Sequence, residues 1–297
     1  MKRLVITAMG VKPILSILLI LALALSSCRS DTGGNGIDIV FLHHSTGKVI
    51  WRGGKDPIIF RIAGRLGTKF ADRAEQRAAL PSLLNKYSRQ QGIDIRIREV
   101  AFPKASPYGW NNYPFDYYNI WVKNAGDQPF TEEPTLEMLT REYDLIIFKH
   151  CYPVSNIGPD ADSADINSDN KTISNYKLQY LALREKLLQF PETKFILFTG
   201  AAQVQSKISE DEALRAKEFF KWVVEEWDLP GDNVHLWDLY SLETEGGLYF
   251  KEEYARSATD SHPNPKFADE AVRLLFSRIV DVIENDGNGT TLAGQSL

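Results

Sequence analysis

The sequence has little cysteine and no excess of positive charge, and each shortage excludes a class of protein. Only 2 of the 297 residues are cysteine, too few for a fold held together by disulfides. The formal net charge is −5, whereas a nucleic-acid-binding protein usually presents a basic face. Beyond the N-terminal segment, no apolar run is long enough to cross a bilayer. With 43% hydrophobic and 25% charged residues, the composition is that of a globular protein with a full core and no nucleic-acid partner.

The N-terminus has the pattern of an export signal. Three basic residues precede an apolar stretch at 14–25, and small residues and Cys28 follow it. This order is typical of a secretory signal peptide. The run Leu25-Ser26-Ser27-Cys28 also resembles the lipobox of bacterial lipoproteins, in which the signal is cut before the cysteine and the cysteine carries the lipid. We therefore predict a signal peptide at 1–27 and a lipoprotein held on a membrane through Cys28, periplasmic or at the cell surface. An ordinary signal peptide with an incidental cysteine is the alternative.

Cleavage at this point would change both the charge and the thiol content. Residues 1–27 hold three basic residues and no acidic one, so the mature net charge would be −8. Lipidation of Cys28 would leave Cys151 as the remaining thiol, so no intrachain disulfide could form. Residues 28–36 are predicted to be a flexible tether, and the Gly/Asn/Thr-rich residues 285–297 a disordered tail.

Five apolar segments predict the strands of one sheet. Nearly continuous apolar runs at 37–43, 143–149, 194–199 and 234–239 are typical of buried parallel strands. The segment 93–101 instead alternates apolar with charged residues, which predicts a strand with one wet face near an edge of the sheet.

Helical patterns lie between these segments. Ser209 with Glu212 predicts a capping box, and Asn264 with Pro265 predicts the cap and first turn of the last helix. The stretch 102–142 is long, aromatic and not clearly periodic, which predicts an irregular region with short helices. Alternating strands and helices predict an α/β fold, a parallel sheet with helices on both faces, in one domain at 37–284.

Polar motifs follow the predicted strands. Because ligands of open α/β sheets bind beyond the carboxyl ends of the strands, residues at these ends are the candidates for a site. Four of the five histidines belong to such motifs, and we expect the fifth, His235 inside a strand, to be structural. The motifs are His43-His44-Ser45-Thr46-Gly47, Lys149-His150-Cys151-Tyr152-Pro153 with Ser155-Asn156, Thr199-Gly200, and Thr259-Asp260-Ser261-His262-Pro263-Asn264.

Three of these residues predict acyl-transfer chemistry. The hydroxyl of Ser45 is a candidate nucleophile, which needs a neighbouring base to take its proton. His262 is the candidate base, and Asp260 could hold its ring in the right tautomer. The backbone N–H of Ser45, on the turn after a strand, could also help to stabilise an oxyanion. A bland alternative is that Ser45 and the His-Pro-Asn run only cap helices.

Taken together, these motifs resemble the SGNH/GDSL hydrolase superfamily over about residues 37–284. In that family the nucleophilic serine follows the first strand and an Asp-x-x-His-Pro block precedes the last helix. The resemblance implies a three-layer α/β/α sandwich of flavodoxin-like order and a serine esterase that needs no metal. Here His43-His44-Ser45 stands in place of Gly-Asp-Ser, and one residue instead of two separates Asp260 from His262. Lys149-His150-Cys151-Tyr152 replaces the family's Gly-x-Asn-Asp block.

The family completes its oxyanion hole with a glycine and an asparagine. Gly109 lies in the right region for the glycine, and Asn111 or Asn112 could supply a side-chain donor. Asn156 is a candidate for the asparagine. The residues expected to line the site are His44, Gly109, Asn112, Lys149, His150 and Asn156.

Some of these residues are also compatible with other functions. The aromatic run Pro107–Trp121 could stack on sugar rings, although packing of a loop onto the core is the favoured alternative. The histidines and Cys151 match no zinc spacing, and the acidic loop at 160–169 lacks the glycine and glutamate of a calcium loop. We therefore expect no metal and no cofactor.

These observations predict an exported serine ester hydrolase, a carbohydrate O-acetylesterase acting on acylated carbohydrate or another small ester. An acyltransferase would use the same residues. The alternative from another class is a non-catalytic glycan-binding surface lipoprotein that keeps the fold.

Overall fold

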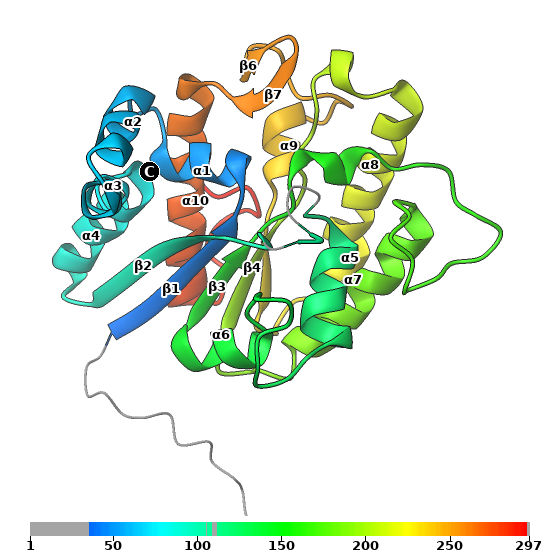
Figure 1. Ribbon diagram of the computed structural model, residues 1–297, viewed down its shortest axis with the longest axis horizontal. Coiled ribbons are helices and arrows are strands. Elements are labelled where there is room, and N and C mark those ends of the chain that lie inside the picture. The colour runs from blue at the N-terminus through cyan, green and yellow to red at the C-terminus, as the bar shows by residue number, and fades with distance from the viewer. Residues whose placement is uncertain (1–35, 105, 109–111, 296–297) are drawn as a thin grey trace, which may run out of the picture. The chain divides into compact units, whose positions relative to one another are not determined.

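A five-stranded parallel sheet forms the centre of the computed structural model, which describes residues 36–104, 106–108 and 112–295 (Figure 1). The strand order is β2-β1-β3-β4-β5, the flavodoxin-like order of doubly wound sheets. All five predicted strands are present, and β2 lies at an edge as its alternating pattern indicated. Their bounds are β1 Gly36–His43, β2 Asp94–Ala101, β3 Leu145–Phe148, β4 Lys194–Phe198 and β5 Val234–Trp237.

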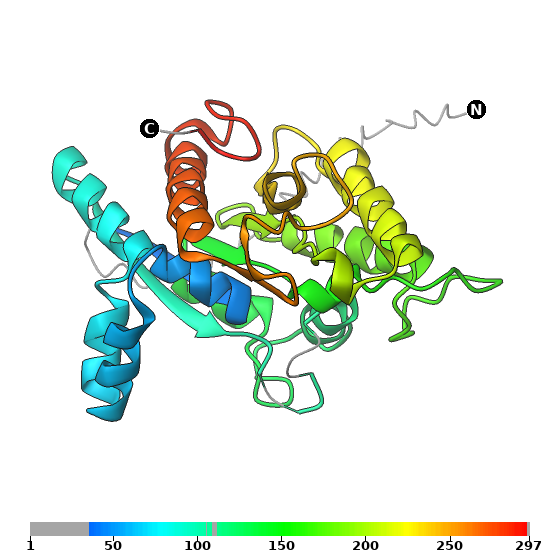
Figure 2. The ribbon, with the colours of Figure 1, turned by 90° about the horizontal axis from the view of Figure 1, so that it is seen from above.

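Helices cover both faces of this sheet, so the predicted three-layer α/β/α fold is confirmed. On one side α1 (Ser45–Arg52), α4 (Ala79–Gln91) and α10 (Pro265–Asn285) contact one another. On the other lie α5 (Pro114–Tyr117), α7 (Ile173–Leu187) and α8 (Glu210–Trp222) (Figures 1 and 2). The further helices are α2 (Pro57–Arg65), α3 (Thr68–Glu75), α6 (Leu136–Glu142), α9 (Leu239–Thr244) and the short η1 (Tyr118–Lys123), η2 (Tyr152–Ser155), η3 (Gln205–Lys207) and η4 (Val223–Trp227).

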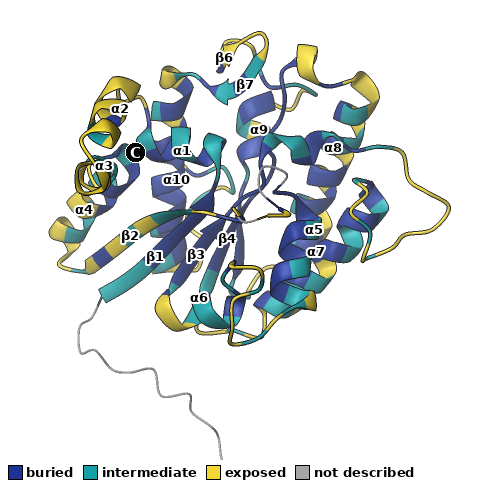
Figure 3. Ribbon diagram, in the orientation of Figure 1, coloured by how far each residue is buried: buried dark blue, intermediate teal, exposed yellow. Residues whose placement is uncertain are grey.

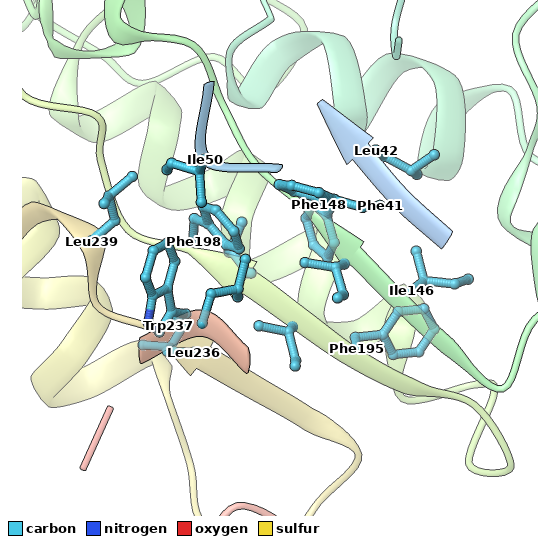
Figure 4. Close-up of a cluster of buried hydrophobic side chains, with 14 of the residues drawn as sticks. Phe41, Leu42, Ile50, Ile146, Phe148, Phe195, Phe198, Leu236, Trp237 and Leu239 are labelled. Carbon is cyan, nitrogen blue, oxygen red and sulfur yellow. The ribbon is translucent and has the colours of Figure 1, made fainter. Parts of the chain in front are cut away.

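The central strands are buried on both faces because helices cover the sheet from either side. All four residues of β3 are buried, and the neighbouring β1 and β4 are buried except at their first residues (Figure 3). Aromatic rings fill the space between sheet and helices: Phe198 lies 5.3 Å from Phe41 and 4.4 Å from Trp237 between ring centroids (Figure 4). Residues Gly34–Leu297 form one compact unit with its own hydrophobic core, so this part of the chain can be studied alone.

Both predicted helix starts are confirmed. Ser209 accepts a hydrogen bond from the backbone N–H of Glu212, which completes the capping box of α8. Asn264 Oδ1 accepts from the N–H of Phe267 at 2.9 Å, and Pro265 opens α10. The second cap fixes where α10 begins, immediately after the strand that carries His262.

The chain ends differ from the sequence-based expectation. The described part of the predicted disordered tail, 285–295, is ordered: its first residue ends α10, the N–H of Asp238 donates to the carbonyl of Leu292 at 2.9 Å, and Trp237 Nε1 donates to that of Ala293 at 3.0 Å. Asp281 accepts from the backbone of Gly289 at 2.7 Å. Hydrogen bonds of this kind leave no apolar periodicity in the sequence. The predictions for residues 1–35, including Cys28, lie outside the described residues.

Close packing of α1 on β1 requires a glycine at position 47. A Cβ there would lie 2.4 Å from Cβ and 2.6 Å from Cγ of His43. We expect Gly47→Ala to lower the free energy of unfolding by about 1–3 kcal/mol, the usual cost of overpacking. Gly64→Ala in α2 is the matched control, because nothing lies within 4 Å of its Cβ position. The control should stabilise by about 0.5–1 kcal/mol through helix propensity alone. Urea denaturation measures both, and equal effects would contradict this account of the packing.

Candidate active site

Ser45 is the first residue of α1, directly after β1 and His44. This position places its backbone N–H among the free amides at a helix N-terminus, where negative charge is stabilised. The site also involves a small antiparallel pair, β6 (Ala255–Ser257) and β7 (Asp260–Pro263). Helix α1 contacts β7, so the chain brings the predicted nucleophile and the predicted acid–base residues to the same end of the sheet.

Asp260 and His262 form a hydrogen-bonded pair. Asp260 Oδ1 lies 2.5 Å from His262 Nδ1 and also accepts from the backbone N–H of His262 at 3.0 Å. The two residues are two apart on a strand, so their side chains lie on the same face. The single intervening residue, Ser261, is therefore compatible with the pairing.

The electrostatics of this pair favour an ionised acid. Partial burial acts to raise the pKa of Asp260, but the hydrogen bonds from His262 outweigh it and lower the pKa from its ordinary value. Arg256 adds to the same effect at 3.3 Å from Asp260 Oδ2. An ionised aspartate at Nδ1 fixes the tautomer in which Nε2 is free to accept a proton.

The ring of His262 is held by the residues around it. Tyr152 packs against it edge to face, with 5.4 Å between the ring centroids. Ser261, between the two paired residues, accepts a hydrogen bond from the N–H of Val204 at 3.1 Å. These contacts tie β7 to the loops after β3 and β4.

Cys151 lies beside Ser45. The backbone N–H of Ser45 lies close enough to the Cys151 thiol to act on the pKa of that group. Burial raises the pKa of Cys151 more than Lys149 and this N–H lower it, so the group is a neutral thiol. The hydroxyl of Ser45 makes no hydrogen bond to His262 or to any other described residue.

The residues beneath α1 support it rather than react. His43 Nε2 lies 2.9 Å from Glu99 Oε2, and Glu99 in turn pairs with Lys48 of α1. Burial lowers the pKa of His43 although Glu99 opposes the shift, so the ring is neutral. His44, the predicted lining residue next to Ser45, is half-buried and bonds through Nε2 to the carbonyl of Pro103 at 2.5 Å.

Three residues predicted to line the site, Lys149, His150 and Asn112, are fully buried. The ammonium of Lys149 donates to the carbonyl of His150 inside the fold. His150 packs edge to face on Tyr117 at 4.8 Å between centroids, and burial lowers its pKa to about 3. Asn112 donates to the carbonyl of Phe102 at 2.6 Å.

The other predicted donors are not brought to Ser45 either. Both ends of the Asn156 side chain have partners: Gln203 donates to its oxygen at 2.9 Å, and its nitrogen lies 3.5 Å from Glu212. Gly109 and Asn111 lie outside the described residues. Of the expected oxyanion donors, the structure places the N–H of Ser45 at the site.

The aromatic residues of the segment Pro107–Trp121 that the structure describes pack on the core, as the favoured alternative predicted. They are at most 8% exposed apart from the half-buried Phe115, so they offer no open face to a sugar ring. The buried members are Tyr108, Tyr113, Tyr117, Tyr118 and Trp121. Trp110 lies outside the described residues.

The roles of Cys151 and Tyr152 were not found in the sequence. Both follow β3 directly, and the carboxyl ends of parallel strands meet at one edge of the sheet. Position alone could therefore have assigned them to the surroundings of Ser45.

Within 36–104, 106–108 and 112–295, no three histidine, cysteine or acidic side chains are grouped so that they could hold a metal ion. Over the same ranges, no helix combines the length and the apolarity that a bilayer span needs.

No protein-family profile and no curated protein matches the chain. Among solved structures, it is similar to a gut microbial diltiazem-metabolizing enzyme, with a TM-score of 0.42 and 11% sequence identity. The match covers 82% of this chain and 46% of that enzyme, so this chain spans less than half of the other's length.

Proposed function

We propose that the protein is a serine ester hydrolase of SGNH type that removes acyl groups, above all acetyl, from carbohydrate. The observation that carries the proposal is the Asp260–His262 pair on β7, in contact with the helix whose first residue is Ser45. A serine at a helix N-terminus beside an oriented imidazole is the arrangement that acyl transfer needs. The choice of carbohydrate rests on the resemblance and on the predicted export.

In this mechanism Ser45 Oγ attacks the acyl carbon while His262 Nε2 takes its proton. Asp260 stabilises the imidazolium that forms, and the Ser45 N–H donates to the oxyanion of the tetrahedral intermediate. The intermediate collapses when His262 returns the proton to the departing alkoxide. Water then attacks the acyl-serine with His262 again as base, which releases the carboxylic acid and restores Ser45.

Two groups must rearrange for this to occur. The side chain of Ser45 must turn toward His262 Nε2, a bond that commonly tightens only when substrate is bound. The backbone N–H of Ser45 must also donate to the oxyanion, where it now faces the sulfur of Cys151. This exchange is favourable because a thiol is a weak acceptor and an oxyanion a strong one.

The proposal predicts that Cys151 limits the rate. A thiol is a weak donor, and one good oxyanion donor contributes about 10²–10³ in rate. We expect Cys151→Asn to raise kcat for ester hydrolysis by at least about tenfold, because the amide adds a good donor to the oxyanion. The two side chains are similar in size, so the substitution should fit the site. Cys151→Ala is the control, which removes the sulfur without adding a donor and should leave kcat below that of Cys151→Asn. Equal kcat values for the two variants would contradict this role.

The experiment that tests the proposed function uses the chain from Gly34 onward. Hydrolysis of an activated acetate and of acetylated oligosaccharides is measured, and a fluorophosphonate that reacts with activated serines is then added. We expect hydrolysis and a single adduct that peptide mass analysis maps to Ser45. Hydrolysis with no adduct at Ser45 would overturn the mechanism.

A second candidate is a glycan-binding protein without catalysis. It is favoured by the missing hydrogen bond between Ser45 and His262 and by the replacement of the family's Gly-x-Asn-Asp block. Glycan-array binding without any hydrolysis would support it. Against it stands the burial of the described aromatic residues that would have stacked on a sugar.

We further propose that the protein is exported and lipidated at Cys28. The support is the order of basic, apolar and small residues before this cysteine. Metabolic labelling of the full chain with a fatty acid should mark the wild type and not Cys28→Ala. Equal labelling would contradict lipidation at this position.

A further inference from the structure

Helices α2 and α3 expose large apolar side chains, and four of these line one groove between the two helices: Ile59, Ile62, Leu66 and Phe70. The five side chains called here the α2–α3 patch are between 51% and 61% exposed: Ile58, Ile59, Ile62, Leu66 and Phe70. The colours of Figure 3 show both helices as largely exposed, and Figure 2 shows them projecting beside α1. Soluble proteins seldom expose several large apolar side chains side by side unless the surface binds something.

The inner side of this hairpin is fixed to α1, so the patch is its outer side. Arg52, the last residue of α1, stacks on the buried ring of Phe60 at 4.2 Å from the centroid. The same guanidinium pairs with Glu75 at the end of α3. The hairpin is therefore held in place, and the exposure of the patch is a property of a fixed element.

The exposed apolar residues of α2 share one face of the helix. Its exposed members Ile58 and Ile62 are four residues apart, with Ile59 beside them, and the C-cap residue Leu66 continues the same face. Arg61 and Arg65 border this face, whereas Phe60 is buried on the side toward α1. An apolar face bordered by arginines is the pattern of helices that lie in the plane of a membrane interface.

The charge of the hairpin is opposite to that of the whole chain. Residues 55–77 contain six basic and three acidic residues, in a chain of net charge −5. The exposed Arg61, Arg65, Lys69 and Arg73 form no ion pair within the described part of the chain. Of the acidic residues, Glu75 is paired with Arg52 and Asp56 caps α2. The cations that remain are thus available to an anionic partner.

A second copy of the chain fits this surface poorly. A symmetric dimer would place the patch against itself, and the flanking arginines would then face one another, which is repulsive. An anionic lipid surface instead complements both the apolar residues and the charge.

We propose that the α2–α3 patch docks on an anionic lipid bilayer, with its apolar side chains in the interface and its basic side chains at the headgroups. The inference uses no residue of the proposed catalytic site and does not depend on lipidation of Cys28. It orients the molecule so that α1, the helix that begins at Ser45, lies next to the membrane.

The test is sedimentation of the chain from Gly34 onward with vesicles. Vesicles of phosphatidylcholine with phosphatidylglycerol are compared with pure phosphatidylcholine, each at low and at high salt. One variant, Arg61→Gln with Arg65→Gln and Lys69→Gln, removes charge. A second, Ile58→Ser with Ile62→Ser and Leu66→Ser, removes apolar surface. The matched control is Leu181→Ser with Leu214→Ser and Leu229→Ser, three leucines outside the hairpin that are 48–51% exposed.

We expect the wild type and the leucine control to sediment with the anionic vesicles and to lose binding at high salt. The charge variant should bind roughly a hundredfold more weakly, and the apolar variant at least about tenfold. Circular dichroism checks that each variant is folded. If the apolar variant is unfolded, the charge variant still tests the proposal. Absence of binding by the wild type would overturn the proposal, as would an equal loss in the leucine control. Dimers in light scattering that only the apolar variant abolishes would assign the patch to a second copy instead.

Discussion

Ser45→Ala is expected to reduce kcat/KM for ester hydrolysis by at least about 10³-fold. The variant lacks the oxygen that forms the acyl-serine, while the helix N-terminus and the Asp260–His262 pair remain. Ser45 is the first residue of α1 and its side chain makes no hydrogen bond within the described residues, so stability should change by less than about 0.5 kcal/mol. Hydrolysis of the activated acetate measures the first effect and thermal unfolding the second.

A double variant separates a nucleophile from a residue that only shapes the site. If Ser45 and His262 act as a unit, Ser45→Ala with His262→Ala should lose little more activity than Ser45→Ala alone. Thr46→Ser, a mild change at the next position along α1, should keep most of the activity. Activity that survives in Ser45→Ala would assign hydrolysis to another group or leave the binding protein as the better hypothesis.

Asp260→Asn is expected to lower kcat by about 10³–10⁴-fold. An amide at 2.5 Å from Nδ1 can donate to that nitrogen, which would move the proton to Nε2 and remove the base. The size and shape of the side chain are kept, so the effect should appear in kcat with little change in KM. Asp269→Asn is the matched control, because Asp269 is also a half-buried aspartate paired with an arginine, Arg273, at 3.1 Å.

The pH dependence provides an independent check on Asp260. Its pKa in the folded protein lies below the ordinary value of 3.8, so the carboxylate stays ionised as the pH falls to that value. Loss of activity through protonation of Asp260 should therefore occur only below about pH 3.8. The assignment would be contradicted if the wild type lost activity well above pH 3.8 and Asp260→Asn showed no such loss.

The sheet could be predicted from the sequence because burial on both faces leaves a direct trace. Runs such as 37–43 and 194–199 are apolar throughout, and the capping residues Ser209 and Asn264 act within one turn of the helices they begin. The pairing of Asp260 with His262 could also be predicted, because the two residues are only two apart on one strand.

The residues around Ser45 could not be assigned in this way. Lys149 and His150 follow a strand, where polar side chains often face a ligand, yet they lie inside the fold. His150 is covered by Tyr117 and Tyr180, which are distant in the sequence and leave no mark near position 150. The apolar residues of α2 are exposed, whereas Lys149 and His150 are polar and buried. A periodic apolar face has the same sequence pattern whether the fold covers it or leaves it exposed.

The catalytic candidates belong to two different parts of the fold, which should differ in local stability. Ser45 lies on a helix packed against the central sheet, whereas Asp260 and His262 belong to a two-stranded ribbon outside it. Two-stranded ribbons are marginally stable by themselves, and native proteins open first in such units. Amide hydrogen exchange in β6 and β7 should therefore proceed through local unfolding, at a lower free energy than exchange in β1 or β3.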